Sequence, residues 1–321
     1  MLLEAVLKKS SALLAAMLIM AAAWWLLHLP GASMQMITFA FLSAAALCNI
    51  PQAKIRIQRC IQMVCCAAAA QFLIGITADH PFTRIIISAV ISFYTLTLIK
   101  NRQSAVIILL ITYLSFLSPP GFSDSLDRSV DIVFSGITVI AVTALGNIFV
   151  SDIRSETANG KPYTTRQAAV ITAELTAGTI IFELAKHEQS AWIMLTILFI
   201  HMAETPRLKI PVLVKQRIAA TIPGILLGGI YLAGFGNSDY RAIYIVPVTG
   251  TLSFFMLYLK NDYFIFTLLF MFTLTVFTDW TLGTCHRFHF NDILFVRSLA
   301  AITGGVLLLC GKNMIQKEST A

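Results

Sequence analysis

The sequence predicts an all-α polytopic membrane protein, with about twelve transmembrane helices arranged as two parallel six-helix repeats. Of its 321 residues, 57% are apolar and only 12% are charged. Soluble domains carry about 25% charged residues, so this chain lacks the polar side chains that a water-soluble surface needs. Apolar runs of about 20 residues recur, and each is long enough to cross a bilayer as a helix. The same composition excludes disorder, collagen and a small disulfide scaffold.

Proline, glycine, asparagine, aspartate and charged residues divide the apolar sequence into twelve candidate spans. These spans cover residues 10–29, 33–50, 59–78, 82–99, 103–119, 129–150, 166–185, 189–204, 217–235, 241–259, 262–279 and 293–312. The first apolar run is longer than the apolar core of a signal peptide, so we expect a retained helix there. The fifth and eighth spans are short, and tilt or a re-entrant path is needed if they fail to span the bilayer.

The charges between the spans predict their orientation. With the N-terminus in the cytoplasm and the side alternating at each span, 17 of the 23 basic residues fall at cytoplasmic ends. The six at outer ends are Arg84, Arg128, Lys186, Arg241, Arg287 and Arg297. This bias predicts that both termini are cytoplasmic. It also explains the net charge of +7 without a nucleic-acid partner, for which the sequence has no basic and aromatic motif.

An internal repeat relates the two halves of the chain. Thr38 precedes Arg59 by 21 residues, and Thr196 precedes Arg217 by the same 21. Further anchors align in the same order, including a Lys-Asn pair between two spans in each half. Six helices per half give both halves the same orientation, which is a parallel repeat. The expected domains are a first repeat at 1–150, a cytoplasmic linker at 151–166 and a second repeat at 167–321.

The most specific stretch of the sequence is 190–229. It contains a Trp-x-x-x-Thr helix, a proline in the following loop, and a helix that reads R-x-x-A-T-x-x-G-x-x-x-G. The positions concerned are Trp192, Thr196, Pro206, Arg217, Ala220, Thr221, Gly224 and Gly228. This stretch resembles the signature region of the fusaric acid resistance and aromatic acid exporter family. In the first half, Arg59 is retained, but Val64 and Cys65-Cys66-Ala67 follow it in place of the Thr and Gly pattern.

The resemblance implies a bacterial inner-membrane exporter of small organic anions, with aromatic carboxylates as substrates and a periplasmic adaptor protein as partner. It implies substrate contact for Trp192, Thr196, Arg217 and Thr221. Arg217 begins a helix at the cytoplasmic side, where a guanidinium and a helix N-terminus both attract anions. Membrane anchoring by positive charge is the alternative explanation for Arg217, and the motif favours function. We expect Gly224 and Gly228 to allow close helix packing, as small residues at this spacing do.

Glu174 is the deepest acidic residue of the chain, about eight residues inside the seventh span. A carboxyl group at that depth is costly, and such residues face a cavity, a charged partner or a proton path. Glu174 is therefore a candidate proton carrier, and a structural glutamate that faces the bundle interior is the alternative. Glu183, near the outer interface, is either a surface carboxylate or the outer end of a proton route from Glu174.

His201 and Glu204 lie three residues apart late in the eighth span, which places them on one helical face. Histidine titrates near neutral pH, so His201 is a second candidate for proton coupling. A polar interface at the membrane surface is the alternative. The spacing does not indicate a metal site, and no cofactor is expected.

Three function classes remain open. A proton-driven exporter is the leading hypothesis, because no P-loop or other nucleotide motif supplies an ATP-driven motor. A non-transporting membrane scaffold of an envelope complex is the second. An intramembrane enzyme that acts on lipid is the third and weakest, so we expect no enzymatic activity. The lipid bilayer is the expected environment, and self-association into a homo-oligomer is compatible with the sequence.

Overall fold

The computed structural model describes the central and C-terminal helices of the chain. The described residues are 52–77, 79–114, 116, 126–127, 129–130, 132–137, 139–140, 162–203, 209–235, 263–282 and 290–318. Within these ranges every regular element is helical and no strand occurs. The expected all-α class is therefore confirmed for the described part of the chain.

The described helices coincide with eight of the predicted spans. They are α3 (Ala53–Ile76), α4 (Pro81–Leu98), α5 (Arg102–Leu114), α7 (Thr165–Ala185), α8 (Trp192–Ala203), α9 (Ile210–Phe235), α11 (Tyr263–Leu282) and α12 (Phe290–Glu318), with the 3-10 turn η2 (Glu188–Ala191) before α8. Five of them, α3, α4, α7, α9 and α12, contain segments long and apolar enough to cross a membrane. The spans predicted at 10–29, 33–50 and 241–259 lie outside the described residues, and most of 129–150 does too.

Two helices begin earlier than predicted. The third span was expected from residue 59 and the ninth from residue 217, but α3 begins at Ala53 and α9 at Ile210. The basic residues that mark the membrane boundary in the sequence, such as Lys54 and Lys215, form the first turns of the helices. Lysine and arginine are good helix formers. Basic residues therefore mark where the membrane-embedded segment begins, but the helix itself can begin before them.

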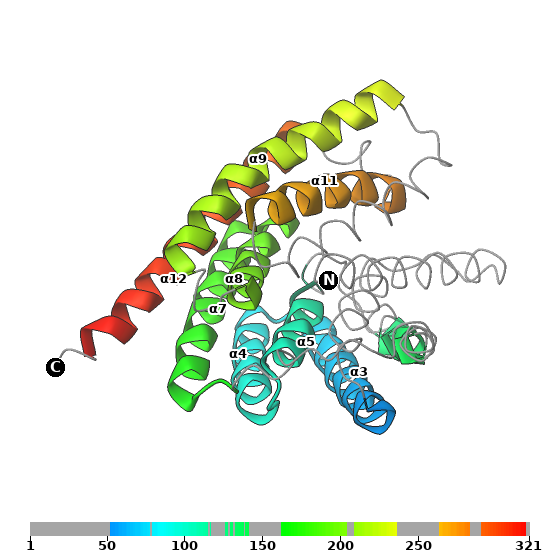
Figure 1. Cartoon of the computed structure of the whole chain (residues 1–321), viewed down its shortest axis with the longest axis vertical. Helices are drawn as coiled ribbons and strands as arrows, with labels where there is room; N and C mark the ends of the chain where they lie inside the picture. The colour runs from blue at the N-terminus through cyan, green and yellow to red at the C-terminus, as the bar shows by residue number, and fades with distance from the viewer. Residues whose placement is uncertain are drawn as a thin grey trace, which may run out of the picture. The chain divides into compact units, whose positions relative to one another are not determined.

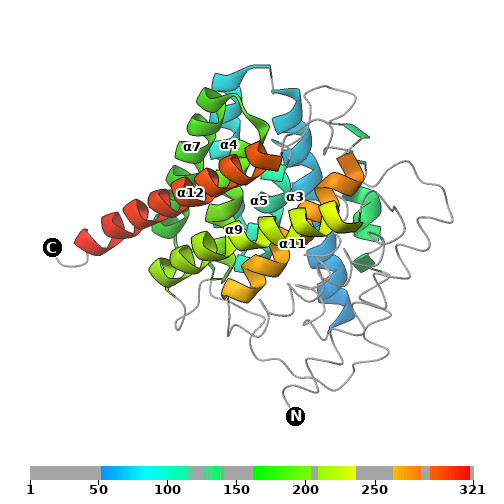
Figure 2. The ribbon, with the colours of Figure 1, turned by 90° about the horizontal axis from the view of Figure 1, so that it is seen from above.

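The chain divides into two compact units. The first consists of Met1–Cys60, Ser135–Ala158 and Ala219–Phe295, and the second of Ile61–Phe134, Asn159–Ile218 and Val296–Ala321. The second unit contains α4, α5, α7 and α8 entirely, which Figures 1 and 2 show as neighbours. The candidate site residues Glu174 and His201 both lie in this unit.

The helices of the second unit pack in antiparallel pairs. α4 packs on α7 and α5 packs on α8, and α4 with α5 and α7 with α8 complete the arrangement. Arg84, near the start of α4, contacts Glu183, near the end of α7. Arg102, at the start of α5, contacts His201, near the end of α8. Neighbouring helices therefore alternate in direction, as sequential crossings of a membrane require.

The two short helices are enclosed by their neighbours. α5 has 13 residues, and all of them from Ser104 to Leu114 are buried. α8 has 12 residues, of which only Met202 is not fully buried. At 1.5 Å per residue these helices are roughly 20 and 18 Å long, shorter than the hydrocarbon core of a bilayer. Their apolar side chains therefore serve helix packing more than lipid contact.

α4 has the reverse of a soluble helix's polarity. Its exposed stripe recurs every fourth residue and consists of Phe82, Ile86, Val90, Tyr94 and Leu98. Its buried face contains Ser88, Ser92 and Thr95. Apolar residues outside and small hydroxyl residues inside are the distribution that a lipid environment favours, because small polar residues allow close helix approach. This helix supports a membrane location without reference to any relative.

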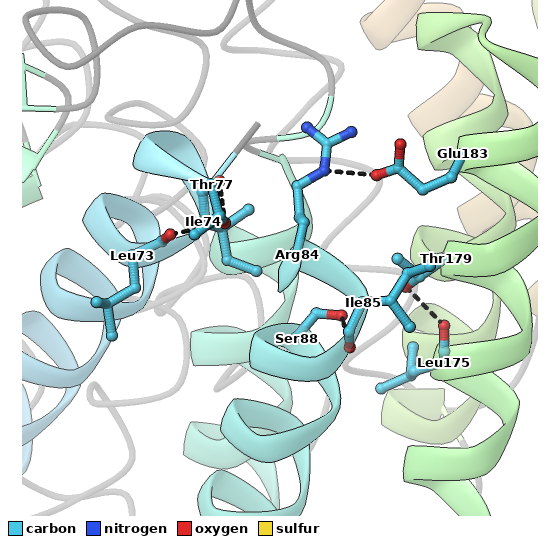
Figure 3. Close-up of polar contacts among 9 residues, drawn as sticks. All are labelled: Leu73, Ile74, Thr77, Arg84, Ile85, Ser88, Leu175, Thr179 and Glu183. Carbon is cyan, nitrogen blue, oxygen red and sulfur yellow. Dashed lines mark hydrogen bonds and ion pairs between the residues drawn. The ribbon is translucent and has the colours of Figure 1, made fainter. Parts of the chain in front are cut away.

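The hydroxyl groups between α4, α5 and α7 are satisfied locally. Ser88 donates to the carbonyl of Ile85 and Thr179 to that of Leu175, each over 2.9 Å within its own helix (Figure 3). Ser92 and Tyr113 share a hydrogen bond of 3.0 Å between α4 and α5. Such bonds remove the cost of leaving a hydroxyl unpaired in an apolar interior.

α7 has well-defined ends. Thr164 caps its N-terminus in a capping box, in which the Thr164 hydroxyl accepts from the Gln167 amide and the Gln167 side chain accepts from the Thr164 amide. Lys186 ends the helix in the left-handed conformation with φ 51°. These two caps fix the length of α7, and so the depth at which Glu174 and Glu183 lie.

Candidate functional site

A buried acid and a buried base meet between α7 and α8. The Nε2 atom of His201 lies 2.8 Å from the Oε2 atom of Glu174. Glu174 keeps 6% of its surface exposed and His201 keeps 5%. Glu174 is the tenth residue of the 21 in α7, so it lies about 14 Å from one end of the helix and about 17 Å from the other. The carboxyl group therefore lies near the middle of α7.

The last turn of α8 fixes the position of His201. A helix leaves its last four carbonyl groups without partners inside the helix, and His201 belongs to this turn. Arg102 of α5 donates from Nη2 to the His201 carbonyl over 3.3 Å. Its guanidinium also lies over the ring of Tyr163, 4.5 Å from the centroid. Arg102 thus connects α5, α8 and the segment that leads into α7.

α12 contacts the acid from another side. Gly311 of α12 lies so close to Glu174 that a Cβ atom at Gly311 would overlap the Glu174 carboxylate. The absence of a side chain at Gly311 therefore makes room for the carboxylate. Elements α5, α7, α8 and α12 all contribute to this one location, which we call the Glu174–His201 site.

The pair contains the two kinds of group that a proton relay needs. A carboxyl group and an imidazole in contact can each bind or release a proton, and such residues form relays inside membrane transporters. Burying either group alone would be strongly unfavourable, and the contact lowers that cost. Within the described residues, no group of three His, Cys, Asp or Glu side chains is placed to hold a metal ion.

Glu183 belongs to a different location. It is nine residues from Glu174, which places it about half a turn round α7 and therefore on the opposite face. There its Oε1 atom accepts a hydrogen bond of 2.6 Å from Nε of Arg84, and both side chains are 12% exposed (Figure 3). The structure does not bring Glu183 into contact with the Glu174–His201 site. Its role as the outer end of a proton route stays a prediction.

Two residues of the predicted substrate set lie on α8. Trp192, the first residue of the helix, is buried, with the guanidinium of Arg297 from α12 4.9 Å from its ring centroid. Thr196 is buried one turn later and faces Gly304, where a Cβ atom would lie 3.1 Å from the threonine Cβ. Both residues therefore face α12.

The remaining motif residues form one buried stripe along α9. Arg217, Thr221, Gly224 and Gly228 follow each other at spacings of three and four residues, and all are buried. The Arg217 guanidinium lies 5.2 Å from the ring centroid of Phe199 on α8. The sequence motif thus describes the inner face of a single helix. Substrate contact by these residues stays a prediction.

Gly224 and Gly228 lie directly against α11 in the first unit. A Cβ atom at Gly224 would lie 2.7 Å from the backbone oxygen of Leu268, and one at Gly228 would lie 2.7 Å from the Cβ of Thr275. Real Cβ atoms do not approach other atoms so closely. The two helices can adopt this separation only with glycine at both positions. The placement supports the helix-packing role predicted for them.

Sequence reasoning missed Arg84, Arg102 and Gly311 as site residues. Arg84 carried a usable signal, because it is one of six basic residues that oppose the charge bias of the loops. Arg297, which covers Trp192, is another of the six. The predicted topology places such a residue on the side that basic residues avoid, which indicates a specific partner. Glu204, predicted to share a face with His201, lies outside the described residues.

The described helices by themselves define a class of protein. They form an all-helical, multi-pass membrane protein with five helices suited to spanning a bilayer and ionisable residues paired inside.

The comparison with protein families is more specific, since residues 176–311 match the family model described as fusaric acid resistance protein-like. The resemblance predicted from the sequence is therefore confirmed over this region, which contains His201, the α9 motif and Gly311. Comparison with curated proteins finds no match, and comparison with solved structures finds none.

Proposed function

We propose that this protein is a proton-driven exporter of small organic carboxylates, chiefly aromatic ones, in a bacterial inner membrane. The observation that carries the proposal is the Glu174–His201 site, an acid and a base in contact near the middle of a membrane helix. The family match supports an exporter-type role. Trp192, Thr196, Arg217 and Thr221 are the substrate contacts of this proposal. It involves no catalytic step, no metal and no cofactor.

The arrangement in the membrane is part of the proposal. Twelve spans form two parallel six-helix repeats, at 1–150 and 167–321, joined by a cytoplasmic linker at 151–166. Both termini are cytoplasmic, so the Arg84–Glu183 pair lies toward the periplasm and Arg102 toward the cytoplasm. The alternating helix directions in the second unit support this order. A periplasmic adaptor and a second copy of the chain are the proposed partners.

Glu174→Gln tests the proton role. Glutamine keeps the shape of the side chain and an oxygen that can accept from His201, but it cannot bind and release a proton at neutral pH. We expect the variant to insert and fold, and to lose efflux driven by an imposed pH gradient. Passive exchange of substrate without a gradient should persist. The measurement is transport of a labelled aromatic acid in membrane vesicles, together with thermal unfolding of the purified protein.

Thr176→Val is the matched control. Thr176 lies two residues from Glu174 on the same helix, and its hydroxyl bonds to the Thr172 carbonyl over 2.7 Å. Valine has nearly the same shape, so this variant should retain gradient-driven efflux. Normal efflux by a stably folded Glu174→Gln variant would refute the proton role. A parallel loss of efflux and of thermal stability would favour a structural role for the carboxyl group.

A second candidate function is supported by one observation. Both Glu174 and Glu183 have basic partners within the described residues, as a scaffold with purely structural polar contacts requires. A scaffold would bind envelope partners and move no substrate. Vesicles that contain the wild-type protein and show no efflux of any of a panel of aromatic acids, with or without a gradient, would favour the scaffold.

A further inference from the structure

One face of α12 connects the Glu174–His201 site with the start of α8. From Val296 onward α12 belongs to the second unit. Its buried residues include a series that recurs at alternating spacings of four and three, which places the series on one side of the helix. The series is Arg297, Ala301, Gly304, Leu308 and Gly311. Gly311 lies against Glu174, and Arg297, roughly 21 Å away along the helix axis, lies over the ring of Trp192.

Gly304 holds α12 against α8 midway between these two contacts. A Cβ atom at Gly304 would lie 2.9 Å from the backbone oxygen of Ile193 and 3.1 Å from the Cβ of Thr196. Because glycine has no side chain, a shift of α12 at this point acts directly on the backbone of α8. α12 is continuous over its 29 residues and contains no proline. Since such a helix is a rigid element, a displacement at Gly311 also reaches Gly304 and Arg297.

Protonation changes what the Glu174 side chain can bond to. As a carboxylate it only accepts hydrogen bonds, and within the described residues its ion-pair partner is His201 of α8. As a protonated acid it gains one O–H donor, and Gly311 brings the backbone of α12 next to it. A helix carbonyl has a second lone pair, so it can accept this bond in addition to its helical one. Proton binding can therefore transfer a bond from α8 to α12, and helix shifts of about 1–2 Å are typical of such switches.

The other charged groups around the site leave this role to Glu174. His201 faces the acid from α8 and also titrates near neutral pH. Four arginines on the surrounding helices contact other residues, and one lysine follows Gly311 at the end of the apolar segment. These residues are Arg84 on α4, Arg102 on α5, Arg217 on α9, and Arg297 and Lys312 on α12. Glu174 is the group that contacts Gly311, so a change on α12 begins with its proton.

We infer that α12 transmits the protonation state of Glu174 to Trp192 and Thr196 on α8. The link itself rests on the three contacts that α12 makes with α7 and α8. Its meaning for transport rests on the proposed function, in which Trp192 and Thr196 contact the substrate. A proton-driven exporter requires coupling of this kind, because proton binding must change the substrate region to drive transport.

Trp192 reports on the link through its own fluorescence. The emission of an indole ring depends on charges close to it, and the Arg297 guanidinium lies 4.9 Å from the Trp192 ring centroid. The test uses the full-length protein in lipid nanodiscs, with phenylalanine in place of the other three tryptophans, which are Trp24, Trp25 and Trp280. Acidification should shift the Trp192 emission maximum in this parent protein. Glu174→Gln should show the acid-form emission at every pH, because an amide always has a donor, as the protonated acid does.

Two variants of α12 separate transmission by the helix from a direct effect of the Glu174 charge. Gly304→Ala places a methyl group against the Ile193 carbonyl, so α12 is held away from α8. The emission shift should then be lost or strongly reduced, although Glu174 is unchanged. Arg297→Gln removes the charge beside Trp192 and should abolish the shift.

Val306→Ala is the matched control. Val306 is 53% exposed, lies on the opposite face of α12 from Gly304, and is nearer than Gly304 to Gly311 along the helix. This variant should retain the full shift, because it changes no contact of α12 with α8. Thermal unfolding of every variant shows which of them are folded. If a variant of α12 does not fold, the comparison of the parent protein with Glu174→Gln decides the question.

The inference is overturned if the parent emission does not change on acidification, if the change persists in Glu174→Gln, or if a folded Gly304→Ala or Arg297→Gln variant retains it. Loss of the shift in Val306→Ala overturns it too. Failure of the exporter proposal gives a different result. The expected emission changes, in a protein without efflux, would support the link and refute export. Efflux by a protein whose Trp192 emission is insensitive to Glu174→Gln would refute the link and leave export intact.

Discussion

Gly311 has a role that its residue type alone does not reveal. Because a side chain there would overlap the Glu174 carboxylate, the missing Cβ is a condition for the contact between Glu174 and His201. A carboxylate is the flexible end of a side chain and can move aside. A small addition at Gly311 should therefore displace the acid from the base more readily than it separates the helices.

Gly311→Ala should abolish gradient-driven efflux while lowering stability by only about 1–2 kcal/mol. In the Glu174→Gln background, which is already expected to lack gradient-driven efflux, the same substitution should cost less stability than in the wild type, because both changes act on one contact. Vesicle transport of the single variants and thermal unfolding of the single and double variants give the comparison. Additive losses of stability would contradict the argument.

Residue type and depth were enough to single out Glu174 and His201, because an ionisable residue inside an apolar run is visible in the sequence itself. Their contact was not predictable. It depends on how α7 and α8 are rotated about their axes, and both helices are apolar on nearly every face. Arg84 and Glu183 were recognisable as charged residues near helix ends, but nothing local to either one indicates a partner 99 residues away.

At the scale of the helix, the sequence predicted which helices exist and where they lie, but it placed their boundaries less accurately. Apolar runs located all eight described helices that correspond to predicted spans, because the length of an apolar run is a direct measure of what a bilayer accepts. The early starts of α3 and α9 were missed because basic residues are good helix formers. The enclosure of α5 and α8 was also missed, since a buried apolar helix and a lipid-facing one have the same composition.

Packing of α9 on α11 provides a test at this scale. A Cβ atom at Gly224 would lie 2.7 Å from the Leu268 backbone oxygen, and backbone cannot move aside as a side chain does. Gly224→Ala should therefore separate the two helices and lower stability by about 1–3 kcal/mol.

Gly234→Ala is the control on the same helix. A Cβ atom there meets nothing within 4 Å, and alanine favours helix over glycine by about 1 kcal/mol, so this variant should be neutral or stabilised. Thermal unfolding of both variants in detergent distinguishes them. Equal unfolding temperatures for the two would show that close packing at Gly224 does not limit stability.

At the scale of the whole molecule, the charge bias predicts that the chain changes sides at each span, and the antiparallel helix contacts agree with this alternation. Arg84, Glu183 and Lys186 lie at one end of the second unit, and Arg102 and Tyr163 lie at the other. α7 connects the two ends and is long and apolar enough to cross a membrane. The prediction is therefore that the segment before it and the residue after it lie on opposite sides. The number of spans and the repeat stay predictions, because four of the twelve spans lie wholly or mostly outside the described residues.

Thiol labelling tests this orientation. In a background without the six native cysteines, Lys186→Cys should react with a membrane-impermeant reagent added to intact spheroplasts. Lys161→Cys should react only after the membrane is permeabilised, because the proposed arrangement places the linker in the cytoplasm. The background protein without cysteines controls for nonspecific labelling. Reaction of Lys161→Cys in intact spheroplasts would invert the orientation and refute the count of spans before it.

The two contacts that close the ends of the second unit also set an order of assembly. Arg84 with Glu183, and Arg102 with His201, each join residues 99 positions apart. During synthesis α4 and α5 therefore leave the ribosome long before their partners exist. An arginine without its partner can extend its guanidinium to the lipid headgroups. Each of these helices can therefore stay in the membrane with its charge at the surface until its partner helix is made. A chain interrupted before α7 lacks the partners of both arginines, whereas one interrupted between α7 and α8 lacks only the partner of Arg102.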